Sequence, residues 1–332
     1  MSITMEKSAL IHFIKSGFFS NPYFLQIEIT DYCPLACPQC YKNETQKNFM
    51  KLNLFKDIVV QAKESGIEHI FLNGGEPLSH PDLCEMMSIL HKLKLKHTIF
   101  TSGYGMNQKF VNIARDMHSN INLSLNGSTD YINSLSRDGY HITLESARIL
   151  KDNQCLYELN WVARHDNVYD LQNLILLGKS VGAKSINVVC NKITSHGELI
   201  SPLTYDDYQF LVAVIKENSD YINVQSCYGL LLSLLNAPSN KLYGCQAGIR
   251  LMAISCTGEY MPCTHLNFRE AFENIDSYWR NSNKLNELRC IDDLKFCDEC
   301  KLCRFCHSMC KSSHDDLQIG LEDCPIRMNI KV

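Results

Sequence analysis

The sequence predicts an α/β fold, either a partial (β/α)6 TIM-like barrel or a doubly wound sheet, followed by a cysteine-rich C-terminal part. From about residue 24 to residue 218, short β-rich runs alternate with amphipathic segments of helical length, which indicates βαβ units and a parallel sheet. With 45% apolar and 20% charged residues, the composition is that of a globular protein. Beyond residue 240 the alternation stops, and ten of the 17 cysteines lie between Cys245 and Cys324.

Six strands and six helices are expected in alternation. Each strand is a short run of β-branched, aromatic or aliphatic residues, and each helix repeats its apolar residues with helical period. The expected strands cover residues 24–30, 69–72, 97–101, 121–125, 156–163 and 185–189. The expected helices cover residues 54–66, 82–93, 109–118, 143–152, 171–182 and 205–217. Six such units fit a partial barrel or a doubly wound sheet, and in a barrel the chemistry gathers at the C-terminal ends of the strands.

The domain boundaries follow from the change in composition. We expect an N-terminal extension at 1–23, the barrel at 24–220, a bridging segment at 221–244 and a second domain at 245–332. This last part contains the run KFCDECKLCRFCHSMCKSS, which has too few aliphatic residues to form a core of its own. It is therefore expected to need bound metal in order to fold.

Charge and cysteine usage exclude several classes of protein. A net charge of −4 is not that of a typical nucleic-acid-binding protein. The chain has no 18-residue apolar run for a membrane helix and no clean signal peptide, so a cytoplasmic location is expected. Thiols stay reduced there, and an odd total of 17 cysteines cannot pair completely. The cysteines are therefore expected to bind metal.

The first metal-binding motif follows directly after the first strand. Cys33, Cys37 and Cys40 have the spacing C-x3-C-x2-C on a loop. Three cysteines can hold three irons of a [4Fe–4S] cluster and leave the fourth iron open to a ligand. The alternative is structural zinc, which prefers four closed ligands and finds no fourth cysteine nearby.

This motif resembles the signature of the radical S-adenosylmethionine (SAM) superfamily, which places C-x3-C-x2-C after the first strand of a partial (β/α)6 barrel. Residues 73–77 match the family's GGEP motif, and residues 124–127 resemble its S-x-D-G motif. The resemblance implies that Cys33, Cys37 and Cys40 hold a [4Fe–4S] cluster whose open iron binds SAM. One electron then cleaves SAM to methionine and a 5′-deoxyadenosyl radical, which abstracts hydrogen from the substrate.

The same resemblance implies a set of SAM contacts. The glycines allow close approach, and their exposed amides and carbonyls are expected to bind the methionine amino group. Polar side chains after the third and fourth strands are expected at the ribose and carboxylate, and an arginine could pair the carboxylate or simply be solvated. The expected residues are Gly74, Gly75, Glu76, Ser102, Ser124, Asn126 and Arg137.

Two positions depart from the family's pattern. The residue before the third cysteine is usually aromatic or histidine, and here it is Gln39. Packing on adenine is therefore assigned to Tyr41 instead. Asn126 stands where relatives carry aspartate.

The C-terminal cysteines allow two interpretations. The run Cys300-x2-Cys303-x2-Cys306-x3-Cys310 has ferredoxin spacing, although Lys311 replaces the usual proline. A larger set of cysteines resembles the SPASM domain of radical SAM enzymes, which holds two auxiliary [4Fe–4S] clusters, and we favour this second interpretation. By that resemblance the cluster nearer the active site takes Cys245, Cys263 and Cys310, and the distal cluster takes Cys297, Cys300, Cys306 and Cys324.

The inner auxiliary cluster is one family ligand short. Relatives carry a further cysteine near position 250, and none is present here. Either its iron is open to substrate, or Cys256 is the extra ligand. Of the remaining cysteines, Cys227 is a candidate hydrogen-atom donor with core packing as the alternative, whereas Cys84 and Cys155 are expected in the core. His265 is expected to pack or to support a ligand.

The resemblance implies an enzyme that crosslinks, epimerises or oxidises a ribosomally made peptide, with SAM and three [4Fe–4S] clusters. An electron donor such as flavodoxin or ferredoxin is expected as a partner. About 23 residues precede the barrel, which favours a separate leader-binding protein or direct docking of the peptide. A dehydrogenase or decarboxylase of a small sugar-like metabolite is the alternative. A non-catalytic electron carrier is disfavoured because it needs no SAM pocket.

Overall fold

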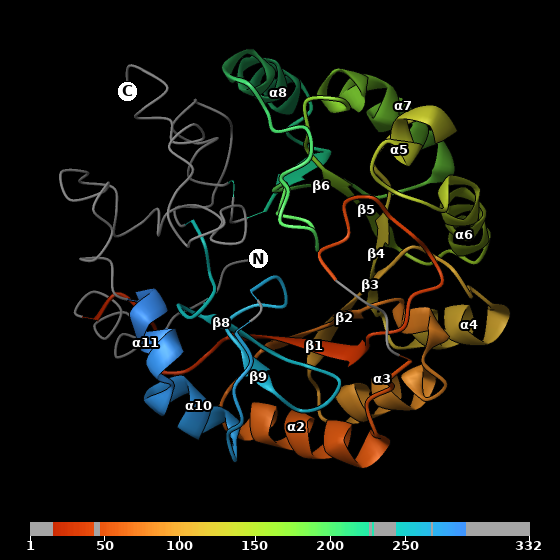
Figure 1. Cartoon of the computed structure of the whole chain (residues 1–332). Helices are drawn as coiled ribbons and strands as arrows, with labels where there is room; N and C mark the ends of the chain where they lie inside the picture. Colours follow the sequence, from red (N-terminus) through yellow and green to blue (C-terminus); the bar gives the residue numbers. More distant parts are fainter. Residues whose placement is uncertain (1–15, 43–46, 226–227, 229–243, 267, 290–332) are drawn as a thin grey trace.

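The computed structural model describes residues 16–42, 47–225, 228, 244–266 and 268–289. A nine-stranded sheet curves into a partial barrel, and helices cover its outer face (Figure 1). The predicted α/β class and partial barrel are confirmed. None of the helices in these residues is long and apolar enough to cross a membrane.

All but one of the neighbouring strand pairs in the sheet are parallel. In sheet order the strands are β7 (Ile222–Val224), β6 (Ile186–Val189), β5 (Tyr157–Val162), β4 (Asn120–Ser124), β3 (Lys96–Thr101), β2 (His69–Gly74), β1 (Phe24–Thr30), β8 (Leu251–Ile254) and β9 (Tyr260–Met261). The exception is β9, which is antiparallel to β8. The first six strands in chain order are the predicted ones. The other three have only two to four residues, too few for a clear strand pattern in the sequence.

Helices follow the strands as predicted. The six expected ones are α2 (Leu52–Glu64), α3 (Leu83–Lys92), α4 (Gln108–Asp116), α6 (Tyr140–Asp152), α7 (Leu171–Val181) and α8 (Tyr205–Glu217). Shorter elements not predicted are η1 (Pro77–Ser79), α5 (Asp130–Ser134), η2 (Val168–Asp170), α10 (Ile275–Asn281) and α11 (Asn283–Arg289). The Asn107 and Thr204 side chains cap α4 and α8 by accepting backbone N–H bonds in the first turn, which fixes where these helices begin.

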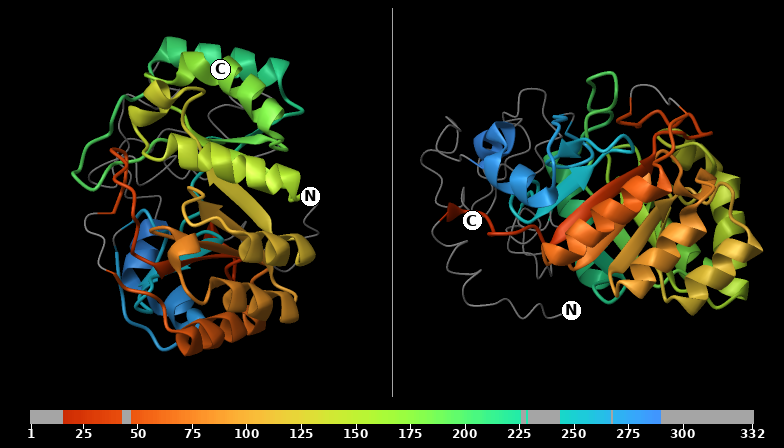
Figure 2. Two further views of the ribbon diagram at one scale, coloured as in Figure 1. Left: turned by 90° about the vertical axis from the view of Figure 1, so that its right-hand side faces the viewer. Right: turned by 90° about the horizontal axis from the view of Figure 1, so that it is seen from below.

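The two faces of each strand have different environments. On β5, Tyr157, Leu159 and Trp161 are buried in the core between the sheet and the helices, whereas Asn160 and Val162 face a cavity inside the barrel. This alternation follows from the two-residue period of a strand. Figure 2 shows the helices on the outer side of the sheet in both views. The apolar core therefore supports the sheet from outside and leaves polar side chains inside.

Residues 244–289 pack directly on the barrel. Strand β8 pairs in parallel with β1, so the sheet continues into the cysteine-rich part of the chain. The Trp279 indole N–H donates to the Phe19 carbonyl at 2.9 Å, and the Thr264 amide donates to the Gln26 side chain at 3.1 Å. These contacts hold the Cys245 and Cys263 segments beside β1.

His69 makes the stability of the barrel pH-dependent. Its Nε2 lies 2.8 Å from the Thr98 hydroxyl, and burial, with the nearby His97 and Lys96, lowers its pKa to about 4. Between pH 6.5 and 4, His69 is therefore protonated in the unfolded chain but still neutral in the folded chain, so the free energy of unfolding falls as the pH falls. Urea unfolding measures this effect. Between pH 7 and 4.5, the free energy of unfolding of His69→Gln should fall by about 2 kcal/mol less than that of wild type. Parallel pH profiles for the two proteins would contradict this assignment.

Candidate active site

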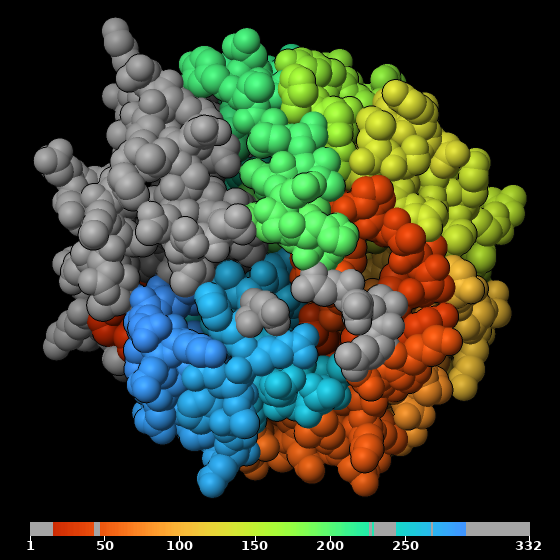
Figure 3. Space-filling model, in the orientation of Figure 1, coloured from red at the N-terminus to blue at the C-terminus, as the bar shows by residue number. Residues whose placement is uncertain are grey.

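A cavity of about 1080 Å³ extends from the inside of the barrel to the C-terminal ends of its strands. It is at the upper end of the range for small-molecule sites, roughly 300–1,000 Å³, and has room for more than one small molecule. Figure 3 shows the face where the loop after β1 (red), the segment after β6 (green) and residues from 244 onward (blue) meet. Thirteen of the residues predicted from the sequence line this cavity: Cys33, Cys37, Cys40, Tyr41, Gly74, Gly75, Glu76, Ser102, Ser124, Asn126, Arg137, Cys245 and Cys263.

The three cysteines of the first motif lie on the loop that leaves β1. The Cys40 amide donates to the Cys37 carbonyl at 3.1 Å, and the Cys40 carbonyl accepts the Ser195 amide from the segment after β6 at 2.8 Å. Burial raises the pKa of the Cys33 thiol to about 11, and Cys37 and Cys40 add to the shift, so the three thiols lie within electrostatic range of one another. Within the described ranges no three His, Cys, Asp or Glu side chains converge on one point as the ligands of a single metal ion would.

Gly74 and Gly75 are required by the close approach of β2 to the cysteine loop. A Cβ atom on Gly75 would lie 2.1 Å from the Tyr32 carbonyl oxygen, and one on Gly74 would lie 2.1 Å from that of Thr30. The Gly75 and Glu76 amides donate to these same two carbonyls, at 2.8 Å each. The expectation of exposed amides is therefore wrong for these two N–H groups, which hold the loop instead of facing a ligand.

Glu76 joins the ends of β2 and β3. Its carboxylate is 1% exposed and accepts four hydrogen bonds: from the Leu78 amide, the Thr101 hydroxyl, the Ser102 amide and the Ser102 hydroxyl. Burial nevertheless raises its pKa, because removal from water penalises the charged form more than these donors favour it. Glu76 and the Ser102 hydroxyl are thus engaged with each other, whereas the Ser124 side chain lines the cavity wall.

The two positions that depart from the family's pattern touch each other. The Asn126 side-chain NH2 donates to Gln39 Oε1 at 2.9 Å and to the Ser136 hydroxyl at 2.8 Å. Its Oδ1 accepts the Val162 amide at 3.0 Å. An aspartate at position 126 could not donate to Gln39, so the amide at one position matches the amide at the other. This pair ties the cysteine loop to the ends of β4 and β5.

Two buried polar atoms at the cavity lack partners among the described residues, Arg137 Nε and Asn73 Oδ1. One is a cationic donor and the other is a neutral acceptor. Such atoms are costly to bury unless a ligand completes them. The carboxylate and ammonium groups of a free amino acid have the complementary chemistry, and SAM carries both at its methionine end. The donor set therefore fits SAM.

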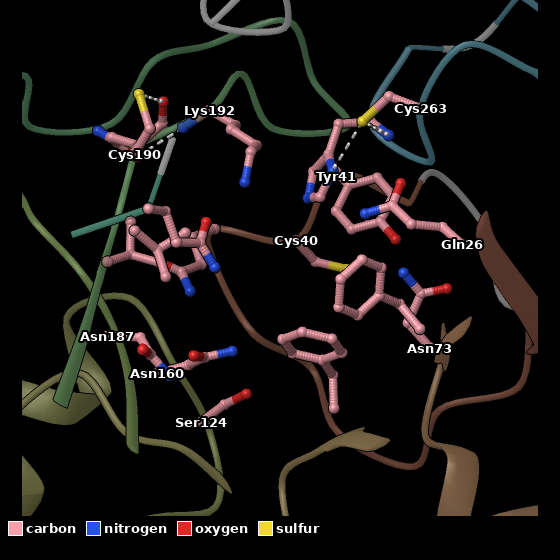
Figure 4. A pocket seen from close by; sticks show the side chains of 18 of the residues that line it. Gln26, Cys40, Tyr41, Asn73, Ser124, Asn160, Asn187, Cys190, Lys192 and Cys263 are labelled. Atoms are coloured by element: carbon pink, nitrogen blue, oxygen red, sulfur yellow. Dashed lines mark hydrogen bonds between the residues drawn. The ribbon is translucent and has the colours of Figure 1, made fainter. Parts of the chain in front are cut away.

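Cys245 and Cys263 line the same cavity from the C-terminal part. The Tyr41 ring packs on His265 with ring centroids 4.1 Å apart, and His265 Nδ1 lies 3.6 Å from the Cys263 sulfur. Figure 4 shows Tyr41 between Cys40 and Cys263. Cys263 is therefore linked to the cysteine loop through one histidine and one tyrosine. No feature of the sequence alone pairs Tyr41 with His265.

Cys256 lies elsewhere. Its buried thiol contacts Asp31 Oδ2 at 3.8 Å, and burial together with that carboxylate raises its pKa to about 11. It does not line the cavity that Cys245 and Cys263 share. The structure therefore does not bring the suggested extra ligand to the other two cysteines. Seven other predicted or discussed cysteines lie outside the described residues: Cys227, Cys297, Cys300, Cys303, Cys306, Cys310 and Cys324.

Sequence reasoning missed a group of amide side chains on the cavity wall. Asn160, Asn187 and Asn223 line it from β5, β6 and β7. A signal was present, because asparagine is depleted in strands and these three interrupt otherwise β-rich runs.

A partial barrel with three thiols on the loop after its first strand is the arrangement of a radical SAM domain. Residues 27–160 match the Radical SAM superfamily, so this part of the chain is a radical SAM domain. The resemblance seen in the sequence is confirmed.

The chain is similar over most of its length to one curated protein. It is 26% identical over 311 residues to the PqqA peptide cyclase of Rhizobium meliloti (strain 1021), covering 86% of this chain and 79% of that protein. It is 28% identical over 177 residues to the PqqA peptide cyclase of Gluconobacter oxydans (strain 621H), covering 51% of this chain and 49% of that one.

Solved structures show the same fold. SuiB of Streptococcus suis, in a crystal structure with S-adenosylmethionine, superposes with a TM-score of 0.77 at 18% identity, covering 94% of this chain and 80% of that chain. Native anSMEcpe, solved with bound AdoMet and Cp18Cys peptide, superposes with a TM-score of 0.68 at 18% identity, covering 89% of this chain and 92% of that one. At such identities the likeness shows the fold.

Proposed function

We propose that this chain is a radical SAM enzyme that abstracts hydrogen from a ribosomally made peptide and thereby crosslinks, epimerises or oxidises it. The observation that carries the proposal is the shared cavity, in which the three-cysteine loop, two C-terminal cysteines, and the Arg137 and Asn73 atoms that lack partners among the described residues meet. Peptide substrates are supported by the curated relatives, which are named as PqqA peptide cyclases, and by the structure of SuiB bound to precursor peptide SuiA.

Each part of the cavity has a role in this proposal. Cys33, Cys37 and Cys40 hold the [4Fe–4S] cluster. Arg137 Nε donates to the SAM carboxylate and Asn73 Oδ1 accepts from its amino group, which satisfies both buried atoms. When bound, the cluster and SAM supply a 5′-deoxyadenosyl radical that takes a hydrogen atom from an unactivated C–H bond.

An apolar wall protects this chemistry from water. Phe24, Phe71 and Phe100 line the cavity from β1, β2 and β3, with successive ring centroids 5.8 Å apart. Aromatic side chains exclude solvent without offering polar groups to a reactive species. They leave the polar wall on β4 to β7 as the place for substrate.

Auxiliary clusters extend the proposal to the C-terminal part. Cys245 and Cys263 hold the inner auxiliary cluster together with Cys310, and Cys297, Cys300, Cys306 and Cys324 hold the distal one. The observation in favour is that Cys245 and Cys263 line the same cavity as the SAM-cluster loop, and that Cys263 contacts His265, whose ring packs on Tyr41 of that loop. A cluster at this place can pass an electron to or from the reaction.

Co-expression with a short peptide encoded beside the gene tests the function. The anaerobically reconstituted enzyme, reduced with dithionite or a flavodoxin, should form 5′-deoxyadenosine and modify that peptide. Mass spectrometry in D2O separates the reactions, because crosslinking or oxidation removes two hydrogens whereas epimerisation replaces one carbon-bound hydrogen with deuterium.

Formation of 5′-deoxyadenosine without any change in the peptide would contradict a peptide substrate. If the peptide is then modified once a separate leader-binding protein is added, the proposal stands and that protein is identified as a partner.

A further inference from the structure

Three asparagines form one row across the polar wall of the cavity. The parallel register aligns Ser124 with Asn160, Asn160 with Asn187, and Asn187 with Asn223. The asparagine row, Asn160, Asn187 and Asn223, therefore runs from β5 across β6 to β7, the edge strand of the sheet. Figure 4 shows Ser124, Asn160 and Asn187 in succession along this wall.

Each carboxamide of the asparagine row is anchored at one end. Asn187 Nδ2 donates to Glu158 Oε2 at 2.9 Å, and Asn223 Nδ2 donates to the Ser185 hydroxyl at 3.0 Å. Asn160 Oδ1 accepts from Asn122 Nδ2 at 3.4 Å. An ionised carboxylate only accepts hydrogen bonds, so Glu158 fixes which way the Asn187 amide points.

The other end of each carboxamide has no hydrogen-bond partner among the described residues. In Asn160 the group without a partner is the NH2, and in Asn187 and Asn223 it is the side-chain oxygen. Asn187 is 9% exposed and lines the cavity, whereas Asn223 lies exposed at the sheet edge. A ligand that covers the Asn187 oxygen buries it, and an amide oxygen buried without a donor costs free energy, so a ligand with a matching donor is favoured.

The open ends match a peptide main chain. A residue in an extended chain presents its N–H and its C=O on the same side. Asn160 and Asn187 lie on adjacent strands about 4.8 Å apart and offer a donor beside an acceptor. The row is uncharged, so it selects amide groups rather than charged side chains.

We propose that the asparagine row is the substrate subsite that binds the main chain of the peptide, an inference that rests on the proposed function. The Asn160 NH2 donates to the C=O of the residue to be modified, and the Asn187 oxygen accepts its N–H. Asn223 accepts the next available N–H where the peptide leaves the barrel over β7. Because the main chain is what is recognised, the α- and β-carbons of the residue to be modified are held in place regardless of its side chain.

Steady-state kinetics of Asn187→Leu with the co-expressed peptide tests the subsite. Its KM for the peptide should rise about tenfold or more, as expected for losing one buried hydrogen bond. Asn173→Leu on α7, whose side chain contacts Asp170 outside the cavity, is the matched control and should keep the wild-type KM. An unchanged KM in Asn187→Leu would overturn the inference, and so would weaker SAM binding with an unchanged KM, which would assign the row to SAM.

A modified substrate makes the test independent of folding. N-methylation of the residue to be modified removes the N–H that Asn187 is proposed to accept. It should raise KM about tenfold with wild type and add little with Asn187→Leu, because both changes delete the same bond. If N-methylation raises KM by the same factor with Asn187→Leu as with wild type, the inference is overturned. A wild type that modifies no peptide would instead overturn the proposed function, and this subsite with it.

Discussion

Gly75→Ala is expected to abolish loading of the SAM cluster. Its Cβ would lie 2.1 Å from the Tyr32 carbonyl oxygen and 2.4 Å from the Tyr32 carbonyl carbon, both backbone atoms of the cysteine loop. Relief of that overlap breaks the bonds by which the Gly75 and Glu76 amides hold the loop. We expect a loss of at least about 3 kcal/mol of stability, as for other backbone-strain mutations, together with loss of bound iron. Thermal unfolding and the iron content after reconstitution measure the two effects.

Gly66→Ala is the matched control. Gly66 has a positive φ of 77°, and a Cβ there would meet nothing within 4 Å. It should cost about 1 kcal/mol and leave the iron content unchanged. Full iron loading in Gly75→Ala would show that the cysteine loop can assemble its cluster without the close approach of β2.

Cys40→Ala is expected to reduce formation of 5′-deoxyadenosine by at least about three orders of magnitude, because an open iron exists only when three thiolates hold the other irons. Chromatography of the reaction products after dithionite reduction measures this. Cys84→Ala is the matched control, since Cys84 lies on α3 and does not line the cavity. Cys263→Ala should still form 5′-deoxyadenosine but lose the peptide product.

Two outcomes would contradict these assignments. If Cys40→Ala cleaves SAM at the wild-type rate, the first motif does not hold the SAM-binding cluster. If Cys263→Ala modifies the peptide at the wild-type rate, the auxiliary cluster has no role in the reaction.

Much of the fold could be predicted because its signals are local. The apolar periods of α2, α3, α4, α6, α7 and α8 and the β-rich runs of β1 to β6 lie within single segments. The pairing of β8 with β1 could not be predicted, because it joins Phe24 to Leu251 across more than 200 residues. The polar cavity wall was missed although its asparagines interrupt β-rich runs, because the strands that carry them become neighbours only in the folded sheet.

The sequence by itself determined the chemistry of this protein: the spacing of Cys33, Cys37 and Cys40, and the motifs after the following strands, indicate SAM and an iron–sulfur cluster. Only the tertiary structure decided which side chains work together. It paired Gln39 with Asn126, placed Cys263 rather than Cys256 at the cavity, and aligned Asn160 with Asn187. Spacing within one loop is fixed by the covalent chain, whereas contacts between distant segments depend on strand register and helix packing.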